Sequence, residues 1–243
     1  MSRDKDSDLE QLNAILFPGI DGTGKMYGPL LECLPDWIAP QVMNYPTQRV
    51  LSYTELTDDV LRRLPVAGEF IIIAESFAGP LALMLRERVP ERVKALVLCG
   101  TFLSNPRPWL SIPARWLLRD WMLAMEPNKF LGKVFVTGFE ISDAMLAKAI
   151  SIHKEVSPTV IRHRLYDVFA VDVRTLYKQC PAPMLHLYGE HDHLILKHSA
   201  REFQRLRPDV PSVSINGPHY LYQMRPQQCS EQIVAFLQQR GIL

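Results

Sequence analysis

Short apolar runs alternate with longer amphipathic segments along most of this chain. Buried strands are predicted where apolar and β-branched residues follow one another, and six segments have this pattern: 13–17, 41–46, 70–73, 93–99, 184–188 and 213–215. Helices are predicted where apolar residues recur every three or four positions, chiefly over 53–64, 81–89, 199–206 and 226–239. Alternating strands and helices favour right-handed βαβ units. We therefore predict an α/β fold with a mostly parallel sheet flanked by helices.

One long segment interrupts this alternation. Residues 104–178 contain several helical patterns but no buried strand, and they follow the strand that ends near Cys99. The chain of 243 residues is long enough for one α/β domain with an insertion. We predict a core of residues 1–103 and 179–243 and a helical cap of residues 104–178. Most of the cap's large apolar residues are expected to pack its own small core: Trp109, Trp116, Trp121, Met122, Met125, Phe130 and Phe135.

Composition excludes few classes of protein. Hydrophobic content of 47%, charged content of 22% and a net charge of +1 are ordinary for a globular protein and give no reason to expect nucleic acid as a partner. The four cysteines are far apart and include no C-x-x-C pair, so reduced thiols are predicted rather than a disulfide scaffold or zinc site. The charged N-terminus resembles neither a signal peptide nor a membrane span, which predicts a cytoplasmic protein without stable membrane insertion.

Ser76 lies where a buried strand pattern changes to a helical one. Its neighbours two positions away are Ala74 and Ala78, and Gly79 follows. Small residues are needed at these positions because a sharp strand-to-helix turn brings them close together. A serine on such a turn is a candidate nucleophile elbow, usually written G-x-S-x-G. Because alanine replaces both glycines, a serine that merely caps the helix stays an alternative.

Two further polar groups follow later strands. Asp192 comes after the strand 184–188, and His219 comes after the strand 213–215. Ligands of open α/β sheets bind at the carboxyl ends of the strands. Ser76, Asp192 and His219 therefore occur in the chain order Ser, Asp, His at three such ends, which is the order of α/β-hydrolases and not of chymotrypsin or subtilisin. Glu190 is an alternative to Asp192 for the carboxylate.

The chain resembles the α/β-hydrolase superfamily over nearly its whole length. The matching residues are Pro18-Gly19, Ala74-x-Ser76-x-Ala78-Gly79, Gly189-x-x-Asp192 and Gly217-x-His219. This resemblance implies that Ser76 is the nucleophile, His219 the general base and Asp192 the carboxylate that orients the imidazole. It also implies an oxyanion hole of the backbone N–H groups of Ile20 and Phe77. The family often has His-Gly where this chain has Pro-Gly, which leaves the backbone donor of the next residue available. It implies no metal and no cofactor.

Shorter matches indicate narrower relatives. The segment 165–174 with Leu187-Tyr-Gly189 is similar to pimeloyl-carrier methyl-ester carboxylesterases. The segment 17–24 with Glu75-Ser-Phe77 is similar to esterase/acyltransferases of the phytyl ester synthase type. These two matches point to different relatives. From the three candidate residues and the superfamily resemblance together, we predict a serine carboxylesterase that hydrolyses an apolar acyl ester through an acyl-enzyme. An acyl-thioesterase or acyltransferase using the same residues stays open, as does a weakly catalytic small-ligand receptor of the same fold.

The predicted cap is basic. Residues 105–178 contain eleven Lys or Arg and seven Asp or Glu, a net charge of +4 against +1 for the whole chain. Besides a small-molecule acyl ester, an acidic acyl carrier or a CoA thioester is therefore a candidate partner at the cap. The alternative interpretation is a charged face that only contacts solvent.

Two other chemistries are disfavoured. The segment Gly19-x₄-Gly24-Lys25 nearly matches a phosphate-binding P-loop. Met26 follows where a magnesium-binding hydroxyl is needed, and Gly28-Pro29 is expected to disrupt the next helix. A second candidate, a metal site, would use the histidines near the acid loop, which are His186, His191, His193 and His198. They lie along one strand and its loop without a second ligand cluster, so we predict structural or surface roles.

Overall fold

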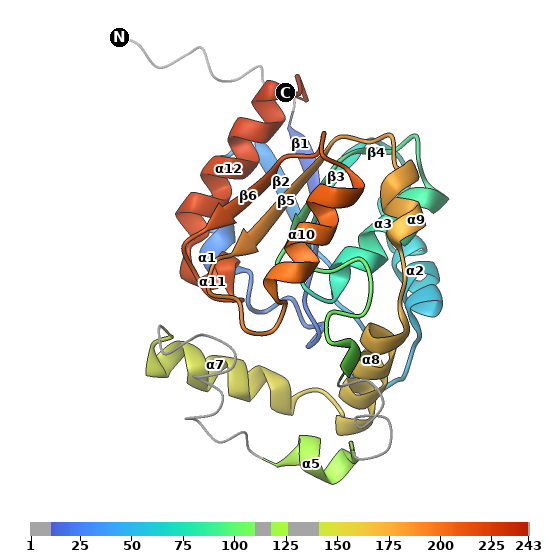
Figure 1. Cartoon of the computed structure of the whole chain (residues 1–243), viewed down its shortest axis with the longest axis vertical. Coiled ribbons are helices and arrows are strands. Elements are labelled where there is room, and N and C mark those ends of the chain that lie inside the picture. The colour runs from blue at the N-terminus through green and yellow to red at the C-terminus, as the bar shows by residue number, and fades with distance from the viewer. Residues whose placement is uncertain (1–10, 110–117, 126–140, 243) are drawn as a thin grey trace.

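The predicted parallel sheet is present. The computed structural model describes residues 11–109, 118–125 and 141–242, and within them six strands form one sheet in the order β2-β1-β3-β4-β5-β6 (Figure 1). All five neighbouring pairs are parallel. The strands are β1 (Leu12–Phe17), β2 (Ile38–Val42), β3 (Phe70–Glu75), β4 (Val93–Cys99), β5 (Met184–Gly189) and β6 (Ser212–Ile215). The α/β class predicted from the sequence is confirmed.

Burial explains the strand patterns. All six residues of the central strand β3 are buried, because helices cover both faces of the sheet. The edge strand β2 starts three residues before the predicted segment 41–46 and includes Pro40, which an edge strand tolerates because one side of it makes no ladder hydrogen bonds. Met43 and Tyr45, which suggested a later strand, are buried in the loop that follows.

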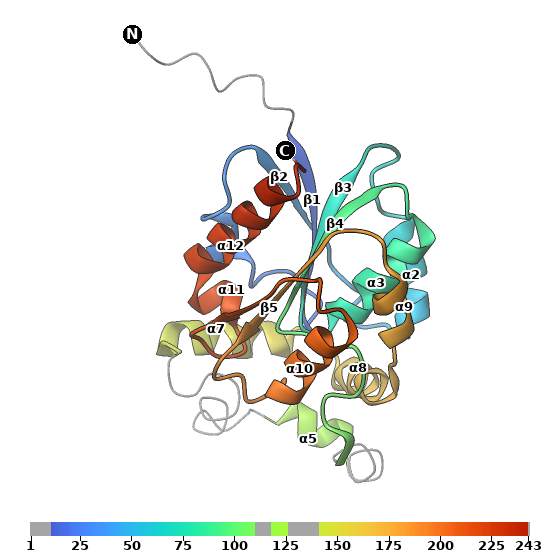
Figure 2. The same ribbon diagram turned by 45° about the horizontal axis from the view of Figure 1, so that its top comes forward.

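Helices form a layer on each face of the sheet (Figures 1 and 2). One layer packs with a large apolar cluster and consists of α2 (Tyr53–Leu61), α3 (Ala78–Arg88), α9 (Arg174–Gln179) and α10 (Lys197–Leu206). The other packs with a second cluster and consists of α1 (Gly28–Leu31), α11 (Leu221–Met224) and α12 (Pro226–Gln239). None of the helices in the described ranges is both long and apolar enough to cross a membrane.

The helix after the glycine-rich turn is short and starts late. A P-loop helix would begin at Gly24-Lys25, but α1 begins at Gly28 and has Pro29 in its first turn. Proline is tolerated there because the N–H that it lacks has no acceptor in the first turn of a helix. The glycine-rich turn is therefore not followed directly by a helix, in line with the expectation from Gly28-Pro29.

Three helices lie across the carboxyl ends of the strands (Figures 1 and 2). They are α5 (Asp120–Ala124), α7 (Asp143–Lys154) and α8 (Pro158–Ala170). Val156, Val160 and Ile161 form a small core of their own with Leu123 and Leu165 packed against it. By contrast, α9 contacts α3, and its Tyr177 belongs to the main core. The division into core and cap at residues 104 and 178 stays a prediction.

The large apolar residues of the cap do not follow the sequence expectation. Trp109, Trp121, Met122 and Met125 are exposed rather than packed inside the cap. The expectation is wrong for these four. For the three in and next to α5, the reason is that this short helix packs on α8 through Leu123. Trp116, Phe130 and Phe135 lie outside the described residues.

Candidate active site

Ser76 sits on a strained turn between β3 and α3. Its φ of +53° is the only positive value for a residue other than glycine among the described residues. Such a conformation is costly for a serine and persists where the surrounding structure enforces it. Here the backbone N–H of Ser76 donates to the Cys99 carbonyl at 2.8 Å, and the hydroxyl of Thr101 donates to the Ser76 carbonyl at 2.5 Å. Both sides of the turn are therefore tied to the end of β4.

The small residues around Ser76 meet a packing demand. Ala74 and Ala78 are fully buried. A Cβ atom added to Gly79 would lie 2.7 Å from Cγ2 of Thr101 and closer still to its Oγ1, so no side chain fits there. The pair of Gly79 and Thr101 supports the turn, and the sequence offered no signal for the threonine beyond its position at a strand end.

Three side chains from separate strand ends form one hydrogen-bonded chain. His219 Nε2 lies 2.9 Å from Ser76 Oγ, and His219 Nδ1 lies 2.7 Å from Asp192 Oδ2. The histidine is 6% exposed and the aspartate 8%. Ser76 follows β3, Asp192 follows β5 and His219 follows β6. The residues named from the sequence as nucleophile, acid and base are thus brought together, although they are up to 143 positions apart in the chain.

The two candidate carboxylates have different surroundings. The Oδ1 atom of Asp192 accepts hydrogen bonds from the backbone N–H groups of Leu194 and Ile195, each at 2.8 Å, which leaves Oδ2 directed at His219. Glu190 is exposed and instead accepts a hydrogen bond from the hydroxyl of Ser214 at 2.8 Å. The geometry therefore favours Asp192 over Glu190.

Two buried groups near Ser76 have shifted pKa values. Burial lowers the pKa of His219, but the charge and hydrogen bond of Asp192 and the charge of Glu75 raise it, and the net pKa lies above the usual 6.5. Burial raises the pKa of Glu75 to about 7, opposed by a hydrogen bond from Gln223, whose Nε2 lies 3.0 Å from the carboxylate. Glu75 thus changes charge near neutral pH. Sequence reasoning missed this role of Glu75 and missed Gln223.

The proposed oxyanion donors flank Ser76. A Cβ atom added to Gly19 would lie 3.8 Å from the Ser76 Cβ atom, which places the turn that contains Ile20 directly beside the serine. Within the described ranges, the backbone N–H groups of Ile20 and Phe77 have no acceptor. Phe77 is held by Tyr53, whose hydroxyl donates to the Phe77 carbonyl at 2.8 Å and whose ring stacks on the phenylalanine at 4.6 Å. Two free donors next to one hydroxyl are the arrangement that an oxyanion requires.

The four histidines near the acid loop do not share a site. His186 is buried, its Nδ1 lies 2.7 Å from the Ser212 hydroxyl, and its ring stacks on Phe203 at 3.9 Å. Burial lowers its pKa to about 3, which keeps it neutral. Across residues 11–109, 118–125 and 141–242, no three His, Cys, Asp or Glu side chains form a cluster that could hold a metal ion.

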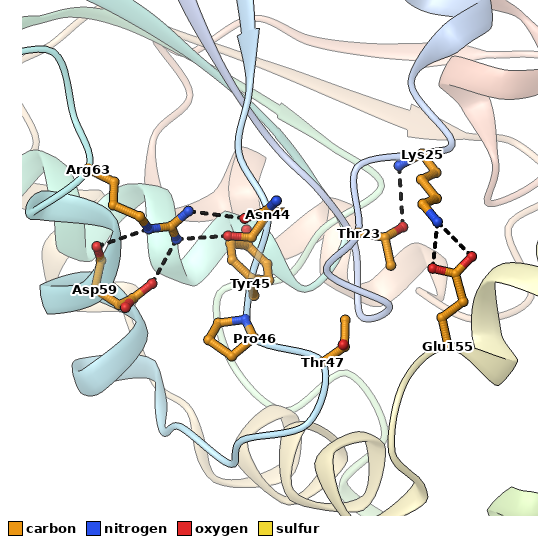
Figure 3. A pocket seen from close by; sticks show the side chains of 9 residues that line it. All are labelled: Thr23, Lys25, Asn44, Tyr45, Pro46, Thr47, Asp59, Arg63 and Glu155. Atoms are coloured by element: carbon orange, nitrogen blue, oxygen red, sulfur yellow. Dashed lines mark hydrogen bonds and ion pairs between the residues drawn. The ribbon is translucent and has the colours of Figure 1, made fainter.

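A separate hollow of about 490 Å³ lies between the core and Glu155 at the end of α7 (Figure 3). Its cations are already paired. Lys25 contacts both oxygens of Glu155 at 2.7 and 2.5 Å, and Arg63 contacts Asp59 at 2.7 Å. Ser76, Asp192 and His219 do not line it, so this hollow is distinct from the site at the strand ends.

Known structures share this architecture. An enol-lactonase from Burkholderia xenovorans LB400 superposes with a TM-score of 0.78 at 18% sequence identity, covering 94% of this chain and 92% of that one. A thermophilic esterase from Thermogutta terrifontis also superposes at 0.78 and 18% identity, covering 94% and 90%. The chain therefore has the α/β-hydrolase fold, which confirms the expectation from the sequence.

One curated relative gives a more specific similarity. The chain is 26% identical over 197 residues to the biotin biosynthesis bifunctional protein BioHC of Teredinibacter turnerae. The match covers 72% of this chain and about a third of the relative's length, 34%. No protein-family model matches the chain.

Proposed function

We propose that this protein is a serine carboxylesterase that hydrolyses an apolar acyl ester through an acyl-enzyme on Ser76. The observation that carries the proposal is the hydrogen-bonded chain from Ser76 through His219 to Asp192. The strained turn under the serine and the two free N–H groups beside it add support. The neighbours that share the fold include an esterase and an enol-lactonase.

In the acylation step, His219 Nε2 takes the proton of Ser76 Oγ as the oxygen attacks the ester carbonyl carbon. The carbonyl oxygen becomes an oxyanion and accepts hydrogen bonds from the N–H groups of Ile20 and Phe77. The C–O bond to the alcohol then breaks, and the imidazolium gives its proton to the leaving alkoxide. Asp192 keeps the Nδ1–H tautomer and stabilises the imidazolium. Deacylation repeats these steps with water as the nucleophile, which releases the carboxylic acid and restores the serine hydroxyl.

The acyl group is proposed to be apolar, and the helices that lie over the carboxyl ends of the strands (Figure 2) are the proposed walls of its pocket. Burying one methylene is worth about 0.8 kcal/mol, close to fourfold in rate. Activity should therefore rise with acyl length over the first few carbons and then fall when the chain outgrows its pocket. An acidic acyl carrier or CoA thioester at the basic cap is the proposed larger partner, and the cytoplasm is the proposed compartment. Carrier-bound acyl esters are the substrates to test first, because the segment 165–174 with Leu187-Tyr-Gly189 is similar to pimeloyl-carrier methyl-ester carboxylesterases.

The test compares wild type with Ser76→Ala and with Ser214→Ala, a serine on β6 that contacts Glu190. Each protein is assayed with p-nitrophenyl esters of two to twelve carbons and with matched acyl thioesters, and covalent acyl adducts are located by mass spectrometry. Ser76→Ala should lose on the order of 10⁴ to 10⁶ in kcat and form no adduct, whereas Ser214→Ala should behave like wild type.

Each outcome has a defined meaning. A folded Ser76→Ala protein that keeps a tenth of wild-type turnover would overturn the proposal. Preference for thioesters over matched esters would make the protein a thioesterase, and ester formation with an added alcohol would make it an acyltransferase. Binding of esters without turnover would favour the receptor alternative.

A further inference from the structure

A buried arginine from α8 reaches the turn that carries one of the proposed oxyanion donors. Arg164 is only 2% exposed. Its Nη1 donates to the carbonyl oxygens of Ile20 and Asp21 at 2.7 and 2.9 Å, and its Nη2 donates to the Pro46 carbonyl at 2.9 Å. The guanidinium therefore links a helix at the carboxyl ends of the strands to two loops of the sheet, including the one beside Ser76.

The guanidinium of Arg164 is buried among backbone carbonyls and aromatic rings. In the described part of the chain, no carboxylate lies within ion-pair distance of Arg164, and burial lowers its pKa. A buried charge is costly unless hydrogen bonds and nearby dipoles compensate for it. The three carbonyls supply the hydrogen bonds, and the rings of Tyr45 and Phe77 lie 5.6 and 6.0 Å from the guanidinium carbon, within the range of cation–π attraction.

Arg164 contacts the turn directly after the peptide that carries the Ile20 N–H. The carbonyl of Gly19 accepts a hydrogen bond from the Gly22 N–H at 3.0 Å. In a trans peptide the N–H points opposite to the carbonyl, so the Ile20 N–H of the same peptide points out of the turn. Arg164 binds the next two carbonyls and packs on Gly22, where an added Cβ atom would lie 2.7 Å from Nη1. Gly22 also has a φ of +72°, which favours glycine.

We propose that Arg164 is a positioning residue that holds the Ile20 N–H in place as an oxyanion donor, so that transition-state stabilisation depends on how α8 is seated on the core. This inference rests on the proposed function. On this proposal, α8 contributes to oxyanion stabilisation as well as covering the site, because its Arg164 guanidinium contacts the Ile20 carbonyl and lies over the Phe77 ring.

The test uses Arg164→Met and Arg164→Lys, with Arg162→Met as the matched control. Arg162 lies on the same helix but pairs with Asp120 at 2.9 Å. Removing an oxyanion donor costs on the order of 10² to 10³ in kcat, and a displaced donor should cost about 10 to 100-fold. We expect Arg164→Met to lower kcat by that factor with little change in KM, and to weaken binding of an alkyl trifluoromethyl ketone by a similar factor. The kcat of Arg164→Lys should lie between those of wild type and Arg164→Met, because an ammonium keeps the charge but cannot donate to several carbonyls in the planar geometry of a guanidinium.

A second readout does not depend on activity. In protein labelled with ¹⁵N-isoleucine, the Ile20 amide signal should move in Arg164→Met and in Arg164→Lys but stay in place in Arg162→Met. If Arg164 only stabilises the fold, the melting temperature will fall while the folded fraction keeps wild-type kcat and ketone affinity, which would overturn the inference. An unmoved Ile20 signal in a folded variant would overturn it as well. Failure of the proposed function is distinct, because wild type and Ser76→Ala would then have equal activity.

Discussion

Replacing Asp192 with asparagine should abolish most activity although the side chain keeps its shape. The Oδ1 atom of the aspartate accepts two backbone N–H groups, from Leu194 and Ile195, at 2.8 Å each. An amide NH₂ in that place would face two donors, so the substituted side chain must keep its oxygen there. Its NH₂ then takes the position of Oδ2, 2.7 Å from His219 Nδ1.

This arrangement selects the wrong tautomer. An amide NH₂ only donates, so His219 Nδ1 would have to accept and its proton would move to Nε2. That nitrogen lies 2.9 Å from Ser76 Oγ and could no longer take the serine's proton. Loss of the correct tautomer costs about 10⁴ in kcat, which corresponds to about 5.4 kcal/mol of transition-state stabilisation.

The assay measures kcat and kcat/KM for Asp192→Asn and Glu190→Gln with one ester, alongside circular dichroism to establish that both fold. Glu190→Gln should lose less than about tenfold, because the glutamine carbonyl can still accept the hydrogen bond that Ser214 now gives to the carboxylate. An Asp192→Asn protein that keeps more than a tenth of wild-type kcat would refute the reasoning. The reverse ranking of the two variants would transfer the acid role to Glu190.

Two further predictions concern pH and packing. The value of kcat/KM should rise with pH through the pKa of His219, which lies above 6.5, since only the neutral imidazole accepts a proton. Glu75→Gln should move this rise to lower pH, because the Glu75 carboxylate raises the pKa of His219. A pH profile that is the same in this variant as in wild type would contradict the coupling between the two groups. Gly79→Ala should lower the free energy of unfolding by about 1–3 kcal/mol in urea denaturation because the new methyl group meets Thr101. Gly28→Ala, where nothing lies within 4 Å, is the control, and equal effects would contradict the packing argument.

The sequence by itself determined the class of the fold. Central strands such as β3 are buried on both faces, so they appear in the sequence as uninterrupted apolar runs. The edge strand β2 is less buried, and its bounds were misplaced because the apolar residues Met43 and Tyr45 pack in the following loop. Ser76, Asp192 and His219 could be named because parallel strands bring their carboxyl ends to one edge of the sheet.

Only the tertiary structure decided which groups support that site. The superfamily resemblance favoured Asp192 over Glu190, and the structure adds the physical difference, which is the direction in which each carboxylate points. Three further residues make hydrogen bonds to residues at or beside the site that are 25, 148 and 144 positions away in the chain: Thr101 to Ser76, Gln223 to Glu75 and Arg164 to Ile20. On an amphipathic helix, the sequence does not distinguish a polar side chain that faces solvent from one that is buried and donates hydrogen bonds to carbonyls. Arg164 is buried because the packing of α8 on the core places its guanidinium against the turn at Ile20.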